Sequence, residues 1–165
     1  MSSKPKDYIR LVDQSTHNLE HAKLCLKWEH HGWGCFSAQK AAELAVKAVL
    51  SLKDLEWMKK VERSRRHNIT ALLRMLQEHV MTPQEIWQAA EELEHLNYRT
   101  LRGQSGSCPL LAQVLFGDNP SLEGYAPYEV VTKDECQNKF NAAELICIWA
   151  RRLIFDVKRP RKSTL

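Results

Sequence analysis

The sequence has few glycine and proline residues and no long hydrophobic run. Its 165 residues include 6 Gly and 6 Pro, which excludes collagen-like and low-complexity chains. No apolar stretch approaches the roughly 18 residues that a transmembrane helix requires. The first seven residues lack the hydrophobic segment of a secretory signal. We therefore expect a cytoplasmic protein with no membrane association.

The cysteine and histidine residues are not spaced as metal ligands. The five cysteines are an odd number and contain no Cys-x-x-Cys pair. His30 and His31 are adjacent, so they cannot share one helical face. We interpret the cysteines as reduced thiols of the core, and we expect no metal and no other cofactor.

What is present is the composition of an ordinary globular protein. Hydrophobic residues make up 44% and charged residues 27%, which is typical of soluble domains. A chain of this length forms one domain with a sufficient core. We expect that domain over residues 1–157, with a basic tail over 158–165. The net charge is +4, and basic residues are concentrated in two blocks, 59–66 and 151–162. Each block is typical of a solvated surface.

Apolar residues recur along the chain at steps of three and four, the spacing of amphipathic helices. No segment shows the two-residue period of a strand. The fold is therefore predicted to be all-α, an antiparallel bundle of about five helices. The predicted helices cover about 6–30, 36–55, 69–80, 83–101 and 132–157.

Polar residues mark several of the helix starts. Asn68 is predicted to be the N-cap of the third helix. Thr82 is the expected cap of the fourth helix, with Pro83 in its first turn. Thr132 and Glu135 form the capping-box pattern at the start of the last helix.

Three segments are predicted to lie between the helices. The glycines in 30–34 predict a turn or a helix cap, and the charged segment 56–66 is predicted to be a loop. Residues 103–127 hold four of the six glycines and three of the six prolines. They predict a long connection, with one helical turn at 110–115. Long connections of this kind are usually functional or mobile.

Three local patterns have the order and spacing seen in one known family. The first covers residues 33–50, where an aromatic residue is followed by Ala-Gln-x-Ala-Ala-Glu-x-Ala-x-Lys-Ala-x-Leu. The second is His-Asn-Ile-Thr-Ala-Leu-Leu at 67–73. The third is Leu-Asn-Tyr-Arg-Thr-Leu-Arg at 96–102, in which Tyr98 and Arg102 match and Gly103 and Gln104 replace a Tyr-Pro pair. Together they resemble the HEPN family (higher eukaryotes and prokaryotes nucleotide-binding domains), over roughly 6–157.

The resemblance implies three kinds of function. Free-standing prokaryotic HEPN proteins are often paired with a minimal nucleotidyltransferase in toxin–antitoxin-like modules. Some HEPN families are metal-independent ribonucleases with an Arg-x4–6-His motif across a dimer interface. The HEPN domain at the C-terminus of sacsin dimerises and binds nucleotides. We favour a non-catalytic, dimerising module that binds a nucleotide or an RNA phosphate, with a minimal nucleotidyltransferase as the expected partner protein. The alternatives are a ribonuclease and a protein-interaction domain in a chaperone context.

Two pairs of residues have the ribonuclease spacing. They are Arg10 with His17 and Arg74 with His79. In such an enzyme the histidine would act as the base for the 2′-hydroxyl and the arginine would bind the phosphate. The numbers of Arg and His in the chain produce about as many matches by chance, and the residue after each arginine is apolar. We interpret all four as surface residues.

The second helix carries one polar stripe. Gln39, Glu43 and Lys47 recur every four residues on a helix that is otherwise apolar. One interpretation is an ordinary intrahelical Glu–Lys pair. The other is that the stripe lines a groove with His67 and Arg102.

In the second interpretation the buried Glu43 holds Arg102 for a phosphate, where the bidentate geometry of arginine is favourable. Tyr98 lies four residues before Arg102 and either stacks on a base or packs on the bundle. The predicted nucleotide-binding residues are Arg102, Lys47, His67, Tyr98, Glu43 and Gln39.

The five tryptophans are many for a chain of this size. Trp33 and Trp149 fit core positions, whereas Trp57 lies in the charged segment. Large aromatic side chains on a surface are typical of protein interfaces. We therefore expect a homodimer.

Overall fold

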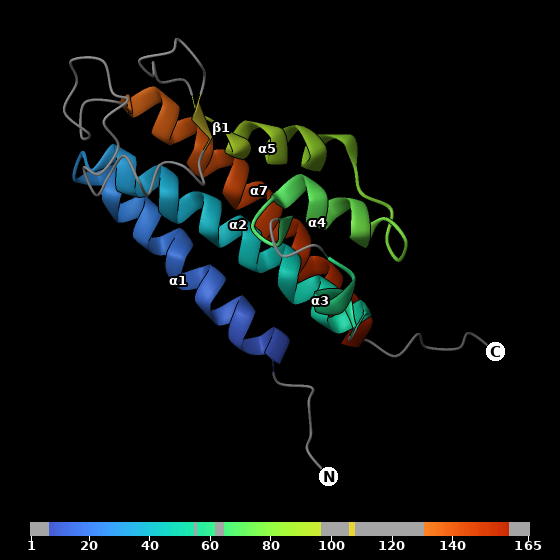
Figure 1. Cartoon of the computed structure of the whole chain (residues 1–165). Helices are drawn as coiled ribbons and strands as arrows, with labels where there is room; N and C mark the ends of the chain where they lie inside the picture. The colour runs from blue at the N-terminus through green and yellow to red at the C-terminus, as the bar shows by residue number, and fades with distance from the viewer. Residues whose placement is uncertain (1–6, 55, 62–64, 97–105, 108–130, 159–165) are drawn as a thin grey trace.

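The computed structural model describes residues 7–54, 56–61, 65–96, 106–107 and 131–158. These residues form six helices and two strands of two residues each (Figure 1). The elements are α1 (Asp7–Lys27), α2 (His31–Lys53), α3 (Trp57–Lys60), α4 (Ile69–Leu76), α5 (Gln84–Glu94), β1 (His95–Leu96), β2 (Gly106–Ser107) and α7 (Lys133–Lys158). The prediction of an all-α helical bundle is confirmed.

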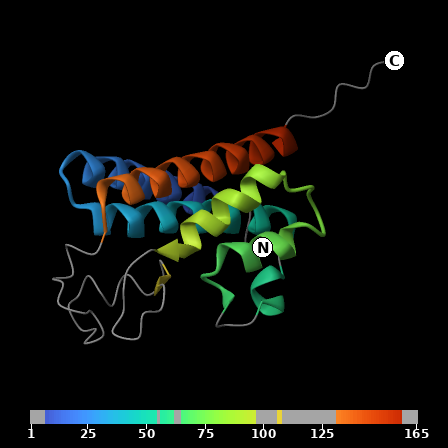
Figure 2. The same cartoon turned by 90° about the horizontal axis from the view of Figure 1, so that it is seen from above.

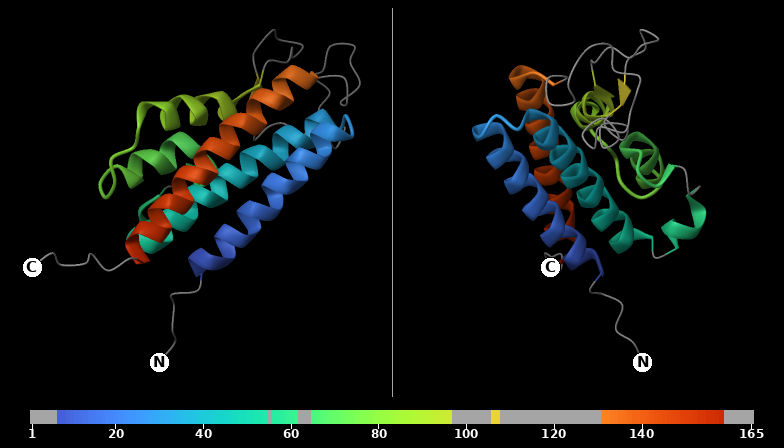
Figure 3. Two further views of the ribbon diagram at one scale, coloured as in Figure 1. Left: turned by 180° about the vertical axis from the view of Figure 1, so that it is seen from behind. Right: turned by 60° about the vertical axis from the view of Figure 1, so that its left-hand side comes forward.

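Three long helices, α1, α2 and α7, lie side by side, and α4 and α5 cover them on one side (Figure 2). Helices that follow one another, α1 and α2 or α4 and α5, run antiparallel (Figure 3). By contrast, α2 and α7 run in the same direction, since α7 begins at the end of the bundle where α2 begins. The antiparallel pair α4–α5 lies between them in sequence and brings the chain back to the end of the bundle where α2 begins.

The core forms around α2, which packs against α1, α4, α5 and α7. Small residues on α2 let its neighbours approach closely, and larger aliphatic residues of the other helices fill the space between them. The buried small residues are Ala38, Ala41, Ala42, Ala45 and Ala48. The larger ones include Leu72, Leu73, Leu76, Ile86, Leu93 and Ile146.

The turn between α1 and α2 comes earlier than predicted. The residue with positive φ is Glu29, at 61°, and α2 already begins at His31. The glycines of the segment therefore lie in the first turn of a helix. A Cβ on Gly34 would lie 2.6 Å from the Sγ of Cys136, closer than real Cβ contacts. This glycine is required for close helix packing and not for a turn.

Two of the three predicted helix caps are confirmed. The Oδ1 of Asn68 accepts a hydrogen bond from the backbone N–H of Ala71 at 2.7 Å. The Oγ1 of Thr132 accepts one from the backbone N–H of Glu135 at 3.2 Å. Each side chain thus satisfies an N–H group that has no partner inside its helix.

The cap predicted for the fourth helix is wrong. Pro83 and not Thr82 is the N-cap of α5. With a ψ of 151°, Pro83 is extended, so helical backbone begins only at Gln84. The Pro83 carbonyl accepts from the N–H of Ile86 at 3.1 Å, and the Thr82 hydroxyl is buried with no hydrogen-bond partner among the residues described.

Two further boundaries differ from the predictions. The segment 56–66, predicted to be a loop, contains α3, and Trp57 in that helix is buried. The helix predicted to reach about residue 101 ends at Glu94, where the antiparallel β1–β2 pair begins. Most of the predicted connection 103–127, including 110–115, and tail residues 159–165 lie outside the described residues.

Four of the cysteines, Cys25, Cys35, Cys136 and Cys147, are buried and form no disulfide, as expected for core thiols. Cys108 lies outside the described residues. The helices that the structure describes are too short or too polar to cross a membrane. The described side chains also contain no group of three or more His, Cys, Asp or Glu suited to a metal ion.

Candidate functional site

The most concentrated charge interactions of the described residues surround one buried carboxylate, Glu43, which is 1% exposed. Its Oε1 lies 2.6 Å from the Nζ of Lys47 and 2.8 Å from the Nδ1 of His67. Its Oε2 lies 2.7 Å from the Nζ of Lys40. We call these residues, with Gln39, the Glu43 cluster.

The sequence places the cluster through helical spacing and one helix start. Lys40 and Lys47 stand three residues before and four residues after Glu43, and both positions share a helical face with it. His67 directly precedes Asn68, the N-cap of α4. The Nε2 of Gln39 donates to the backbone carbonyl of His67 at 3.3 Å and lies 3.4 Å from the Oε2 of Glu43. It therefore ties the start of α4 to the middle of α2.

The cluster has an excess of positive charge. Burial raises the pKa of the Glu43 carboxyl, but hydrogen bonds and charge from Lys40 and Lys47 outweigh it, so the pKa lies below its ordinary value. Glu43 is therefore ionised at neutral pH. Two ammonium groups on one carboxylate leave a charge of +1 while His67 is neutral, and +2 when it is protonated.

Two of the cluster's basic side chains are open to solvent, whereas Lys47 is only 12% exposed and the carboxylate is buried. The side chain of His67 is 62% exposed and that of Lys40 is 29% exposed. A carboxylate only accepts hydrogen bonds, so the Nδ1–H of His67 donates to Glu43 and its Nε2 is the acceptor in the neutral ring. The Oε1 of Gln39 is buried and has no donor among the described residues. The exposed donors of the cluster are thus the lysine ammonium groups, and the amide oxygen of Gln39 is a buried acceptor.

The end of α5 is held beside this site. The Oε1 and Oε2 of Glu94 accept from the backbone N–H and the hydroxyl of Thr70, each at 2.9 Å. Thr70 lies in the first turn of α4, three residues after His67. The described contacts thus bring the chain toward the cluster just before the third family-like segment.

The structure brings together four of the six predicted site residues: Gln39, Glu43, Lys47 and His67. The other two, Tyr98 and Arg102, lie outside the described residues. Sequence reasoning missed Lys40. Its signal was the spacing of three residues from Glu43, which a stripe defined in steps of four does not include.

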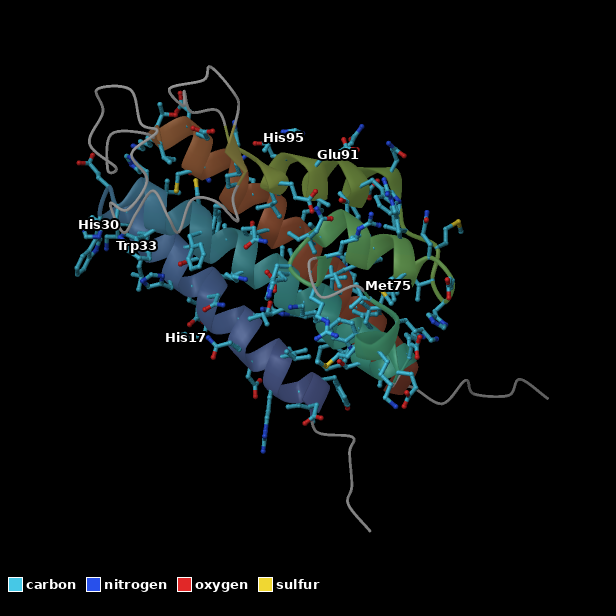
Figure 4. All side chains as sticks on the ribbon, in the orientation of Figure 1. His17, His30, Trp33, Met75, Glu91 and His95 are labelled. Atoms are coloured by element: carbon cyan, nitrogen blue, oxygen red, sulfur yellow. The ribbon has the colours of Figure 1, made fainter. Side chains whose placement is uncertain are left out.

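The two Arg–His pairs with ribonuclease spacing lie in different parts of the bundle, the first on α1 and the second on α4 and the turn after it. Arg10 and His17 are exposed on α1, and Arg74 is exposed on α4. Figure 4 shows His17 on the outer side of α1 and Met75, the residue after Arg74, across the bundle on α4. His79 lies 3.7 Å from the Oδ2 of Asp54. None of these residues contacts the Glu43 carboxylate.

The comparison that decides the family is with domain models. The model of the HEPN domain matches residues 8–101, more than half of the chain. The chain belongs to the HEPN family. The matched region contains every residue of the Glu43 cluster, and the resemblance seen in the sequence is confirmed. No curated protein matches this HEPN chain significantly.

Solved structures share the fold of this chain. TT1696 from Thermus thermophilus has a TM-score of 0.65 and 22% identity, covering 88% of this HEPN chain and 97% of its own. The archaeal HEPN homologue ST0689 has a TM-score of 0.58 and 22% identity, covering 89% and 97%. The HEPN domain protein tm0613 from Thermotoga maritima has a TM-score of 0.57 and 25% identity, covering 88% and 98%. The HEPN fold is thus shared over nearly the whole chain.

Proposed function

We propose that this HEPN protein binds the phosphate of a nucleotide or of RNA at the Glu43 cluster, without catalysing a reaction. The observation that carries the proposal is the buried Glu43 carboxylate, which holds the ammonium groups of Lys40 and Lys47 on its two oxygens. An ammonium group has three protons, so each lysine keeps donors for a phosphate oxygen. The carboxylate thus acts as a fixed support for two cations.

The surroundings of the cluster favour an anion. The cluster has a net positive charge, and the exposed ring of His67 adds a donor at Nε2 when it is protonated. His67 also stands at the start of α4, where backbone N–H groups favour negative charge. We include Arg102 and Tyr98 in the proposal, with Arg102 as a bidentate phosphate ligand and Tyr98 as a stacking side chain.

The test is a calorimetric titration with GTP, ATP and a short single-stranded RNA. We expect Lys47→Gln and Lys40→Gln each to weaken binding by about tenfold to a hundredfold, because each removes a charge-assisted hydrogen bond of about 1.5–3 kcal/mol. The matched control is Lys23→Gln, an exposed lysine on α1, which is expected to bind as the wild type does. The RNA and nucleotide arms separate the two sources of phosphate.

Thermal unfolding of each variant shows whether it is folded under the titration conditions. Equal binding by wild type, Lys40→Gln and Lys47→Gln would remove the cluster as the site. Metal-independent cleavage of the RNA by the wild type would instead favour the ribonuclease alternative.

We also propose that the protein is a homodimer, through an apolar patch at the α1–α2 turn. Trp28 is 66% exposed, and Leu24 and Trp33 are exposed near it; Figure 4 shows Trp33 beside His30 at this end of the bundle. Contrary to the prediction from sequence, Trp33 is thus a surface residue. Exposed aromatic side chains of this kind are typical of interfaces.

Light scattering at high micromolar concentration is expected to give twice the 19.1 kDa chain mass for the wild type. The double variant Leu24→Ser, Trp28→Ser is expected to be monomeric. Met81→Ser, at another exposed apolar residue, is the control and is expected to stay dimeric. A monomeric wild type would contradict the proposal.

A further inference from the structure

The Glu43 cluster contains one histidine, the kind of side chain that ordinarily changes its charge between pH 5 and 8. Lysine and an ionised glutamate keep their charges over that range. The ring of His67 is reached by solvent, because its side chain is 62% exposed. Its position is nevertheless fixed, since its Nδ1 lies 2.8 Å from the Oε1 of Glu43 and its backbone carbonyl accepts from Gln39 at 3.3 Å.

The contact with Glu43 decides which ring nitrogen of His67 gains and loses a proton. Because a carboxylate only accepts hydrogen bonds, Nδ1 keeps its proton for Glu43 and Nε2 is the nitrogen that changes. In the neutral ring Nε2 is an acceptor, which repels the oxygens of a phosphate. In the charged ring it is a donor with a positive charge, which attracts them. One proton therefore changes the contribution of His67 to an anion site from unfavourable to favourable.

The charges that α2 places around the ring act in opposite directions. Glu43 favours the charged ring. Lys40 opposes it, with its Nζ 3.4 Å from the Nδ1 of His67, and so does Lys47 on the same carboxylate oxygen. An anion bound at the two lysines offsets their opposition and makes protonation of the ring more favourable. By linkage, a charged ring makes binding of the anion more favourable by the same factor.

The neighbouring elements add no charged contact to the ring among the described residues. From α5, the carboxylate of Glu94 accepts from Thr70, three residues after His67. On the side of α3, the guanidinium of Arg66 donates to the backbone carbonyl of Met58 at 2.9 Å. The coupling between the ring and a bound anion therefore depends on the three charged residues of α2.

We propose that the Glu43 cluster binds its phosphate together with a proton, which His67 takes up at Nε2 and releases again as the pH rises. This inference rests on the proposed function and adds a form of regulation to the same site. The affinity for phosphate is highest where the ring is charged, and it falls as the pH rises through the range in which histidine becomes neutral. The site therefore holds phosphate more tightly in mildly acidic than in mildly alkaline solution.

The experiment is a calorimetric titration of GTP, and of the single-stranded RNA, into the wild type and into His67→Gln at about pH 6 and about pH 8. Glutamine keeps an N–H donor for Glu43 but cannot gain a proton. Any titration of the ligand's own phosphate is the same for both proteins, so the comparison isolates His67. Between the two pH values we expect the affinity of the wild type to fall about tenfold more than that of the variant, the factor that one charge-assisted hydrogen bond supplies.

Uptake of a proton is the second readout. The heat of binding at about pH 7 is compared in Hepes and in Tris, two buffers with different heats of ionisation. The wild type is expected to take up more protons on binding than His67→Gln does. His17→Gln, at an exposed histidine of α1, is the matched control and is expected to behave as the wild type. His67→Lys stays charged at both pH values and is expected to lose the difference between them.

The outcomes separate this inference from the proposed function. Equal pH dependence and equal proton uptake in the wild type and His67→Gln would overturn the coupling, although the phosphate site stands because both proteins bind. If neither GTP nor the RNA binds the wild type at either pH, the proposed function fails and this inference with it. The side chain of His67 is largely exposed, so its replacement is expected to leave the fold intact, and thermal unfolding at both pH values verifies this.

Discussion

Replacing Glu43 with alanine is expected to lower the free energy of unfolding by about 3 kcal/mol. The substitution removes the carboxylate that Lys40, Lys47 and His67 share. Removing one member of a buried ion pair is costly because the remaining charges keep their loss of hydration. We take the lower end of the usual range because Lys40 and His67 are partly hydrated. Urea unfolding of both proteins measures the difference, and Glu20→Ala on the exposed face of α1 is the matched control.

The stability that Glu43 contributes is expected to fall as the pH is lowered. The pKa of Glu43 is lowered in the folded protein, whereas an unfolded glutamate has a pKa of about 4.3. The stability contributed by the ionised group is therefore fully present above about pH 4.3 and is lost as the pH falls through the folded pKa. Glu43→Gln keeps the shape of the side chain without the charge. It is expected to lose less stability than the wild type over that acid range.

An Ala variant as stable as the wild type would show that the cluster contributes no net stabilisation. A Gln variant with the same acid dependence as the wild type would show that Glu43 is not the group that titrates. Either result would contradict the description of Glu43 as a buried, ionised support for the two lysines.

The second large effect is expected at Lys139. This lysine of α7 is 2% exposed, and its Nζ donates to the backbone carbonyls of Glu92 and His95 at the end of α5. It thereby satisfies carbonyls that a helix end leaves without partners, and its charge is favourable there. Lys139→Met keeps the length of the side chain and removes these donors. We expect a loss of about 2–4 kcal/mol, because two charge-assisted hydrogen bonds of a buried ammonium group are removed.

Lys139→Met is expected to loosen the structure locally as well as to lower the overall stability. Amide hydrogen exchange is expected to accelerate most in the last turn of α5 and in β1, where the carbonyls lose their partner. Lys133→Met, on an exposed lysine in the first turn of the same helix, is expected to change stability by less than about 0.5 kcal/mol. Equal stability and unchanged exchange in Lys139→Met would contradict this role.

Much of the fold follows from local sequence. The periodic apolar residues predict the long helices because an amphipathic helix must bury one face. Asn68 and Thr132 could be assigned as caps, because each places a side-chain oxygen just before a helical pattern, where it can accept from a backbone N–H of the first turn. By contrast, Gly34 does not lie in a turn as predicted, and Pro83 is the N-cap of α5 and not a residue of its first turn. Close packing of Gly34 against Cys136 depends on two distant segments meeting, and no local pattern reports that.

The candidate site was only partly predictable. Helical spacing placed Gln39, Glu43 and Lys47 on one face, and the family-like pattern added His67. That Glu43 is almost fully buried depends on α4 packing over α2, which spacing does not show. Trp57 was assigned to a charged loop because its neighbours are lysines and glutamates. Its burial, with the indole N–H bonded to Ser51 of α2, arises from tertiary packing.

The most direct test of the central claim is to map GTP binding by NMR on the isotope-labelled wild-type protein. The claim is that the cations held by Glu43 form the phosphate site of this HEPN domain. We predict saturable shifts concentrated at the amides of 39–47 and 67–70 and at the side chains of Lys40, Lys47 and His67. Shifts confined to other surfaces, such as the basic residues of α7, or no shifts at millimolar GTP, would contradict it.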